Sequence, residues 1–259
     1  EALPVLEKEL RINPNYCDAL CNLGFAQNAL EKYDLAMPLF LRSLKLRPAY
    51  TEAHLGLARI FQEKDELDKA EQAANNAVRL APEMPETHST MGQVYSRLGS
   101  FEKSEAIFNK ALELDPGLGS ALVGKGNLYM EAGRIKEAED LFVHSLAVST
   151  EKLASRYYIA QVRKTLEEDE NLKALEEEVK HVDQLPVGKA IFLHFALGKC
   201  YDDIKDYDNA FSHFLQGARM KRARNSYDHE EKMRLFDNVM HQLDQTRIDQ
   251  LRGHGNDSH

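Results

Sequence analysis

Two short segments carry residue types that could bind phosphate or zinc, and both depart from the pattern that this chemistry needs. Residues 119–125 read Gly-Ser-Ala-Leu-Val-Gly-Lys, like a phosphate-binding loop, but Gly126 stands where a Ser or Thr would hold magnesium. Such a loop also follows a strand, whereas this segment falls in a predicted helix. His229 and Glu230 begin a zinc-protease pattern, but Met233 replaces its second histidine. We therefore predict no metal site, no bound cofactor and no catalytic residues here.

The cysteines and the regularly spaced histidines are too scattered to form a metal centre. Cys17 and Cys21 lie one helical turn apart without further ligands nearby, so we interpret them as small core residues. His54, His88 and His194 share one position of the repeat described below. Stacked helices lie about 8–10 Å apart, whereas zinc needs nitrogens within about 2.1 Å. These histidines are therefore expected to fill grooves between helices, and no catalytic triad can be assembled.

Composition limits the class of partner. The chain has 259 residues, a formal net charge of −9, three cysteines and no tryptophan. A negative chain opposes nucleic-acid binding, which needs a basic surface. No apolar run in the sequence is long enough to span a membrane. An odd number of thiols suits a reducing compartment, so the sequence predicts a cytoplasmic protein without a disulfide framework.

The elements around these residues repeat along the chain with one period. Small residues stand 34 positions apart, and ladders of proline, of a second small residue and of mostly aromatic residues keep the same spacing: Gly24, Ala58, Gly92, Gly126; Pro14, Pro48, Pro82, Pro116; Ala36, Ala70, Ser104, Ala138; Phe40, Ala74, Phe108, Phe142. A period of this length marks stacked helix-turn-helix units.

Each unit reads as two amphipathic helices. In the third unit His88, Met91, Gly92 and Tyr95 lie on one face, at i, i+3, i+4 and i+7. Only Gly or Ala fits where the two helices of a unit cross closely, and larger residues fill the grooves beside that crossing. A proline after the second helix cannot continue it but suits the start of the next helix. The sequence therefore predicts an all-α fold.

The unit that runs from His88 to Pro116, HSTMGQVYSRLGSFEKSEAIFNKALELDP, resembles a tetratricopeptide repeat (TPR). The resemblance rests on several positions that recur in four consecutive units. It implies a right-handed α-α superhelix, the TPR solenoid, which holds other molecules and does not transform them.

The register of the repeat divides the chain. Ala2, Leu6 and Pro14 keep the phases of a second helix, so the chain is expected to begin inside a unit whose first helix is missing. Thr150 replaces the next proline of the ladder, and a divergent unit follows it. The predicted parts are a second helix of a truncated TPR (1–16), four regular TPRs (17–152), a divergent TPR (153–186), a sixth TPR (187–224), a capping helix (225–250) and a flexible linker (251–259).

The last part of the chain carries a second resemblance. Residues 193–228 are similar to the last repeat of bacterial proteins in which TPRs precede a sulfotransferase domain, and residues 247–258 are similar to the segment that leads into that domain. This resemblance implies that the chain is the scaffold part of such an enzyme. The phosphosulfate-binding Arg-Ser-Gly-Thr loop that would follow is not in the sequence.

The first helix of each TPR lines the concave surface, so the resemblance implies which residues face a partner. Amides in a row can hydrogen-bond the backbone of an extended peptide, and aromatic residues with Arg59 can anchor its side chains. The residues expected on this peptide-binding face are Asn22, Phe25, Arg59, Gln93, Asn127, Tyr157, Gln161, Phe195 and Lys199. The Lys/Asn clamp with which some TPRs hold chaperone tails is absent from the matching phases.

The leading hypothesis is a non-catalytic scaffold that binds a protein or peptide segment in its concave groove. One alternative is the substrate-presenting arm of a sulfotransferase whose catalytic domain is not in this chain. Another is self-assembly, in which the truncated first unit exposes Leu3 and Leu6 to a second copy and forms a homo-oligomer.

Overall fold

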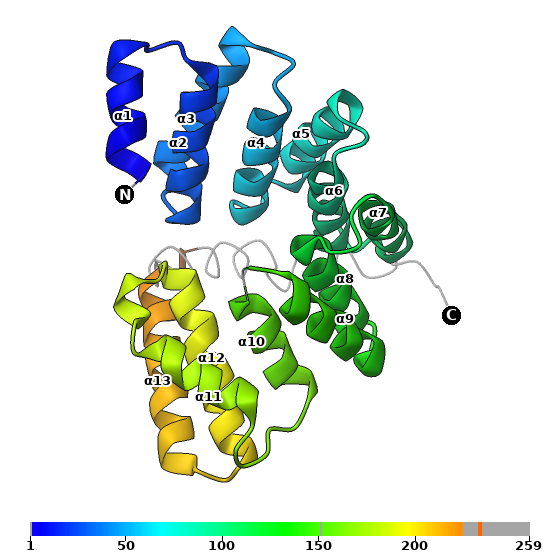
Figure 1. The fold of residues 1–259 in the computed structure, drawn as a ribbon, viewed down its shortest axis with the longest axis vertical. Coiled ribbons are helices and arrows are strands. Elements are labelled where there is room, and N and C mark those ends of the chain that lie inside the picture. Colours follow the sequence, from blue (N-terminus) through cyan, green and yellow to red (C-terminus); the bar gives the residue numbers. More distant parts are fainter. Residues whose placement is uncertain (1, 151, 225–232, 235–259) are drawn as a thin grey trace, which may run out of the picture. The chain divides into compact units, whose positions relative to one another are not determined.

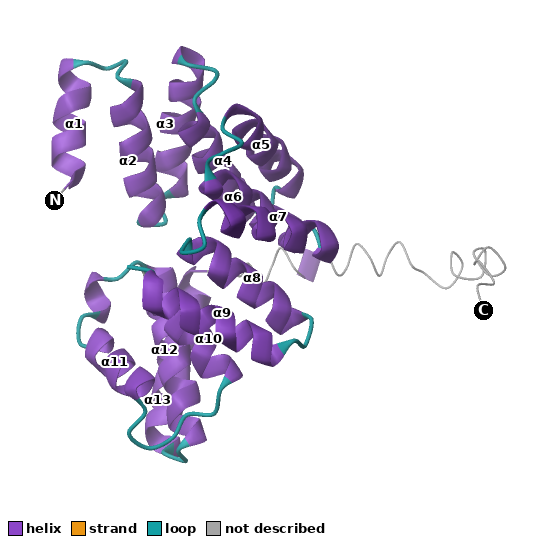
Figure 2. Cartoon of the chain, turned by 45° about the vertical axis from the view of Figure 1, so that its right-hand side comes forward, coloured by secondary structure: helices purple, strands orange, loops and turns teal. Residues whose placement is uncertain are grey.

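The computed structural model describes residues 2–150, 152–224 and 233–234 (Figure 1). All regular secondary structure in these residues is helical (Figure 2). The chain divides into two compact units, residues 1–218 and 219–259, and α13 runs from the first into the second. The predicted capping helix and linker lie outside the described residues, apart from residues 233 and 234, which are helical.

Unit 1 is a succession of helix pairs, each packed against the next along the chain (Figure 1). The pairs that follow the 34-residue period are α2 (Cys17–Ala29) with α3 (Tyr33–Leu46), α4 (Thr51–Glu63) with α5 (Leu67–Leu80), α6 (Pro85–Arg97) with α7 (Phe101–Leu114), and α8 (Gly119–Glu131) with α9 (Ile135–Val148). The predicted all-α superhelix is confirmed by this arrangement. The segment that mimics a phosphate loop is the start of α8.

The remaining helices flank or follow the regular pairs. They are α1 (Ala2–Ile12), α10 (Leu153–Val162), α11 (Glu170–Val179), the short 3-10 helix η1 (Val182–Gln184), α12 (Val187–Asp203) and α13 (Tyr207–Arg224). No helix among the described residues combines the length and the apolar character that crossing a membrane needs.

The repeated small and aromatic residues form the core. All members of the two small-residue ladders and of the aromatic ladder are buried in the regular pairs, and the prolines lie exposed in the turns between pairs. Ser104 stands where the other members of its ladder are alanine. Its hydroxyl donates a 2.8 Å hydrogen bond to the carbonyl of Gly92. That bond satisfies the polar group that the substitution adds to the crossing.

The aromatic ring of a second helix explains why the neighbouring residues are small. A Cβ atom built on Gly92 would lie 2.8 Å from the Phe108 ring of the same pair, and one built on Gly124 would lie 2.6 Å from the same ring. Phe40 occupies the same place against Gly24 and Gly56. The ring therefore joins its own unit to the next one, because it fills the space that glycines on both first helices leave open.

The turns inside the pairs share a backbone conformation that the sequence shows only in part. Gly99 and Gly133 have positive φ angles of 69° and 76°, and Glu31 and Asp65 take the same position with φ near 60°. Lys205 repeats this conformation between α12 and α13, with φ of 66°. Glycine adopts positive φ without strain, whereas other residues, Lys among them, lose free energy there.

The divergent pair departs from the regular ones. Its second helix, α11, has only 10 residues and ends at Val179, and η1 follows it. Leu172 and Leu175 of α11 pack with Leu193 and Leu197 of α12 in a separate core cluster. The pair has lost the Gly/Phe contact of the regular repeats, and leucines from two units replace it.

Candidate functional site

An open groove of about 560 Å³ runs across the first helices of successive pairs. It is lined by residues of α4, α6, α8 and α10, by Phe108 of α7, and by residues of the turns before α8 and after α9. These residues, which we call the central groove, are Gln62, Glu63, Gln93, Ser96, Arg97, Phe108, Leu118, Gly119, Ser120, Val123, Gly124, Asn127, Ser149, Ala154 and Tyr158. The repeat places them on one face because each first helix presents the same side to the same space.

The floor of the central groove is apolar. Phe108 lies fully buried beneath Gly124, and Val123 and Leu118 stand beside them, half-buried. Tyr158 of α10 stacks on Phe142, with ring centroids 4.9 Å apart. Apolar surface at the bottom of an open groove suits the side chains of a bound segment, which lose their contact with water there.

The walls of the central groove carry amides and hydroxyls. Gln93 is half-buried, and the Nδ2 of Asn127 donates a 3.0 Å hydrogen bond to Glu131 on its own helix. The hydroxyls of Ser89 and Ser120 lie 2.9 Å apart and join α6 to α8. Arg97 forms a 2.9 Å ion pair with Asp65. Neutral hydrogen-bonding groups therefore dominate this part of the wall.

A second groove of about 300 Å³ adjoins the first and shares Gln62, Glu63 and Gln93 with it. We call it the Arg59 groove. Its residues come from α2, the turn after it, the start of α3, α4, α6 and the start of α12: Asn28, Ala29, Glu31, Tyr33, Arg59, Gln62, Glu63, Gln93, Pro186 and Lys189. The carboxylate of Glu31 accepts a 2.8 Å hydrogen bond from the backbone N–H of Gly188, so the first regular pair and α12 meet at this groove.

Arg59 is the charged residue that α4 contributes to this groove together with Glu63. It is half-buried, and its guanidinium lies 5.9 Å from the centroid of the Phe25 ring. Burial lowers the pKa of the Arg59 guanidinium, and the negative charge of Glu86 opposes that shift. The residue remains a cation at neutral pH, since the guanidinium of arginine loses its proton only far above neutral pH.

The structure brings together three of the nine residues predicted for the concave face. Gln93 lines both grooves, Arg59 lines the second and Asn127 lines the first. Asn22 and Gln161 are exposed on α2 and α10, away from both sets of lining residues.

The three predicted aromatic residues are held mainly by other rings. Phe25 packs edge-on against Phe40, with centroids 5.0 Å apart. Tyr157 contacts Phe192, and its burial raises the pKa of its hydroxyl. Phe195 lies 6.4 Å from Phe214, centroid to centroid. Tyr158, next to Tyr157, lines the central groove together with Ala154 of the same helix.

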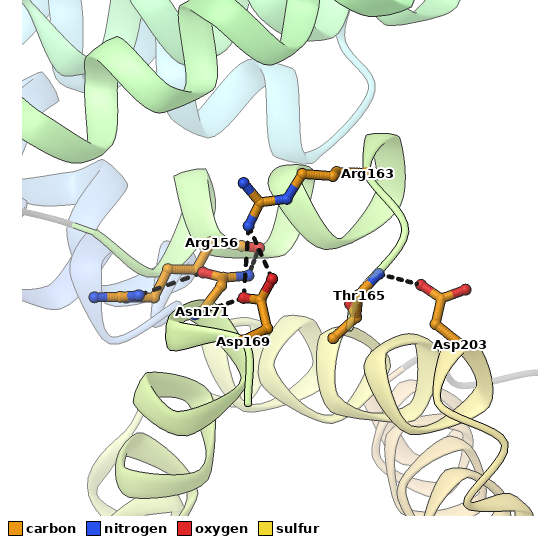
Figure 3. Close-up of polar contacts among 6 residues, drawn as sticks. All are labelled: Arg156, Arg163, Thr165, Asp169, Asn171 and Asp203. Carbon is orange, nitrogen blue, oxygen red and sulfur yellow. Dashed lines mark hydrogen bonds and ion pairs between the residues drawn. The ribbon is translucent and has the colours of Figure 1, made fainter. Parts of the chain in front are cut away.

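Lys199, the last of the predicted residues, is engaged within its own helix. Its amino group pairs with Asp203, four residues later in α12. The second carboxylate oxygen of Asp203 accepts a 3.0 Å hydrogen bond from the backbone N–H of Thr165, in the loop after α10 (Figure 3). This contact fixes a loop, and neither groove includes Lys199.

The residues that sequence reasoning missed lie one turn further along the first helices. Gln62 and Glu63 follow Arg59 by three and four residues, and Ser96 and Arg97 follow Gln93 in the same way. The repeat register contains this row, since residues three and four apart share a helix face. The turn residues Glu31 and Ser149 carry no such signal.

Polar contacts hold the divergent pair beside the central groove (Figure 3). Asp169 begins α11 and accepts a 2.7 Å hydrogen bond from the backbone N–H of Asn171, the usual geometry of a helix N-cap. The same carboxylate pairs with Arg163 at 3.1 Å. The Asn171 side chain donates to the carbonyl of Arg156 and accepts from its guanidinium. These bonds position α10, which carries Tyr158.

The histidines of the shared repeat position hold turns. The Nε2 atoms of His54 and His88 lie 3.0 and 2.7 Å from the carbonyl oxygens of Pro48 and Pro82. His194 differs, because its Nδ1 lies 3.0 Å from the Nδ1 of His213. Among the described residues, no three His, Cys, Asp or Glu side chains are grouped so that they could hold a metal ion.

The predicted core cysteines are buried. The Cys21 thiol lies 3.4 Å from the hydroxyl of Ser43, and Cys17 is 8% exposed. Burial raises the pKa of Cys21 to about 11, so the thiol stays protonated at neutral pH. A buried, protonated thiol is a poor nucleophile and a poor metal ligand.

Family models agree with the repeat. Models described as tetratricopeptide repeat match residues 28–94, 85–118 and 193–224. A search of the curated proteins gave no match. The resemblance of residues 193–228 to repeats that precede a sulfotransferase domain, the cytoplasmic location and the formation of a homo-oligomer stay predictions.

Solved structures share the fold at low identity. The TPR protein TTC0263 of Thermus thermophilus aligns with a TM-score of 0.55 and 18% identity, over 79% of this chain and 98% of that one. A TPR protein from Parabacteroides merdae gives 0.55 and 20%, over 92% and 91%. The Cut9-Hcn1 structure of the APC/C gives 0.63 and 17%, over 85% of this chain and 43% of that one. Residues 28–118 and 193–224 therefore match tetratricopeptide repeats, and the chain shares its helical fold with solved TPR structures.

Proposed function

We propose that the chain is a non-catalytic scaffold that binds an extended protein segment in the central groove. The observation that supports this proposal is the groove itself, in which successive first helices present an apolar floor between walls of amides and hydroxyls. An extended backbone needs hydrogen-bonding partners along its length, and its side chains need apolar contacts at intervals.

The lining residues suit this ligand better than a compact small molecule. Gln93 and Asn127 occupy the same position in successive repeats, so their amides form a row along the groove. An amide both donates and accepts, as does each peptide group of a bound strand. Val123 and Tyr158 line the same groove and offer apolar contacts to side chains.

Selection of peptides followed by measured binding tests this function. Short random peptides displayed on phage are selected on the wild-type chain, and the selected peptides are then synthesised and titrated by isothermal calorimetry. Asn127→Arg places a long charged side chain in the groove and is expected to weaken binding about tenfold or more.

Asn109→Arg is the matched control. Asn109 is exposed on the outer helix α7 and lines neither groove, so the same change there leaves binding unaltered. Both variants are first shown to melt like the wild type by circular dichroism. Equal affinity of the two variants for the selected peptides would reject the central groove as the binding site.

A further inference from the structure

Arg59 is a half-buried cation on α4. Among the residues that the structure describes, none forms a hydrogen bond or an ion pair with its guanidinium, which lies over the face of Phe25 at 5.9 Å from the ring centroid. Surface arginines nearby differ in this respect, because Arg97 and Arg134 each pair with a carboxylate at about 3 Å. A cation that is partly removed from water without a counter-charge costs free energy in the unbound protein.

The carboxylates around Arg59 face other groups. Glu31 accepts a hydrogen bond from the backbone N–H of Gly188, and Glu63 accepts one from the hydroxyl of Tyr33 at 3.4 Å. Glu86 acts on Arg59 only at a distance, as a favourable charge without a hydrogen bond. The groove beside Arg59 is also lined by the amides of Gln62 and Gln93, which bring no charge of their own, and by Lys189, a second cation.

We propose that Arg59 binds a carboxylate of the segment held in the grooves, so that the preferred partner is an acidic peptide. The inference rests on the proposed function, since the two grooves share Gln62, Glu63 and Gln93 and form one path along α4 and α6. A guanidinium presents two parallel N–H donors that match the two oxygens of a carboxylate. The incoming carboxylate supplies the missing counter-charge, and the adjacent Gln93 amide can bond the backbone beside it.

The test compares the sequences that two versions of the chain select from one library. Random peptides displayed on phage, with their C-termini joined to the coat protein, are selected on the wild type and on Arg59→Glu. The wild type is expected to enrich Asp or Glu at one fixed position of the selected motif. The charge-reversed variant is expected to enrich Lys or Arg at that same position.

Synthetic peptides then measure the effect. Asn or Gln in place of the enriched acidic residue is expected to weaken binding to the wild type about 10- to 100-fold. The same exchange leaves binding to Arg59→Gln almost unchanged, because the partner charge is already gone. If instead the amidated and free-acid forms differ by that factor, the carboxylate that Arg59 binds is the C-terminal one.

Arg79→Glu is the control for net charge. Arg79 is exposed on α5 and lines neither groove, so this variant should select the same acidic position as the wild type. An acidic preference that is absent, or that persists unchanged in Arg59→Glu, would overturn the assignment of Arg59 while leaving peptide binding intact. Selected peptides that bind Asn127→Arg as well as they bind the wild type would overturn the groove and this inference together.

Discussion

At the scale of single residues, contacts between a phenylalanine and two glycines hold successive units together. Phe108 is fully buried against Gly92 of its own pair and Gly124 of the next. Where the second helix has Ala74 instead of a phenylalanine, the equivalent positions on the first helices hold the larger Ala58 and Thr90. The total volume of the three side chains at this contact is thus similar, although it is divided differently among them, as a close-packed interior requires.

The Gly92–Phe108 contact predicts a coupled effect of two substitutions. Gly92→Ala should lower the free energy of unfolding by about 1–3 kcal/mol, because the added Cβ overlaps the ring. Phe108→Ala alone should cost about 3–5 kcal/mol through the cavity it leaves. In a Phe108→Leu background the cost of Gly92→Ala should shrink. Urea unfolding of the wild type, Gly92→Ala, Phe108→Leu and the double variant measures this coupling. Strictly additive costs would show that the ring and the glycine do not touch.

At the scale of elements, the turns between paired helices contain a correctable strain. Lys205 is exposed and has a positive φ of 66°, in the position that Gly99 and Gly133 hold in other units. Lys205→Gly should raise the free energy of unfolding by about 0.5–1 kcal/mol, since glycine adopts this conformation without strain.

Lys110→Gly gives the matched comparison for that turn. Lys110 is exposed in the interior of α7, where glycine should destabilise by about 1 kcal/mol because it gains freedom in the unfolded chain. Thermal unfolding of both variants checks the pair of signs. A loss of stability for Lys205→Gly would mean that Lys205 does not hold the left-handed turn.

The contact between α12 and α13 contains a pair of histidines that predicts a pH dependence. The Nδ1 atoms of His194 and His213 lie 3.0 Å apart, so one must donate while the other stays unprotonated. Burial lowers the pKa of both, and the charge of His194 lowers the pKa of His213 further, against the opposing charge of Glu176 on α11. Tyr201 stacks over His213 and carries no charge at neutral pH.

The direction of this pH dependence follows from the lowered pKa values of the two histidines in the folded chain. With the folded pKa below the unfolded value of about 6.5, the unfolded chain takes up more protons as pH falls through that window. The melting temperature should therefore drop between about pH 7.5 and pH 5.5, and His213→Gln should reduce the drop. His144→Gln, at an exposed position of α9, is the control. An equal drop of the melting temperature in the wild type and in His213→Gln would show that the histidine pair does not cause the pH dependence.

The N-cap of α11 gives a further test at this scale. The Asp169 carboxylate caps the helix and pairs with Arg163 (Figure 3). Asp169→Ala should lower the free energy of unfolding by about 0.5–2 kcal/mol, the usual loss of a capping side chain. Asp169→Asn should retain most of the stability, because its amide oxygen can still accept the N–H of Asn171. Equal losses for the two variants in urea unfolding would show that charge, and not capping, matters here.

At the scale of the whole molecule, the sequence predicts the fold better than the site. The repeat spacing predicts the regular helices, because the small and aromatic residues that recur at this spacing are all buried in the structure. Of the residues predicted for the concave face, Gln93 and Asn127 line the central groove, whereas Phe25 and Phe195 contact other rings. Ring contacts between units depend on the sizes of both residues in contact. The spacing of residues along one helix does not show which residue of another helix lies opposite.

The residues that sequence reasoning missed belong to parts of the chain without a period. Glu31 lines the Arg59 groove because a turn of the first regular pair meets the start of α12, 157 residues later in the chain. The divergent pair brings Tyr158, and not Tyr157, to the central groove through capping and polar contacts of α10 and α11. Such long-range contacts follow from the curvature of the stacked helices, to which each unit contributes a small rotation.

Crosslinking of a bound peptide tests the central claim most directly, because it reports position without relying on loss of binding. A photoreactive benzoylphenylalanine is placed at Gln93 or Asn127 in the grooves, and at Asn109 or Val143 on the exposed outer helices. Illumination with a selected peptide should give crosslinks from residues 93 and 127 and almost none from 109 and 143. Crosslinks that favour the outer positions, or that do not distinguish the two sets, would contradict binding in the groove.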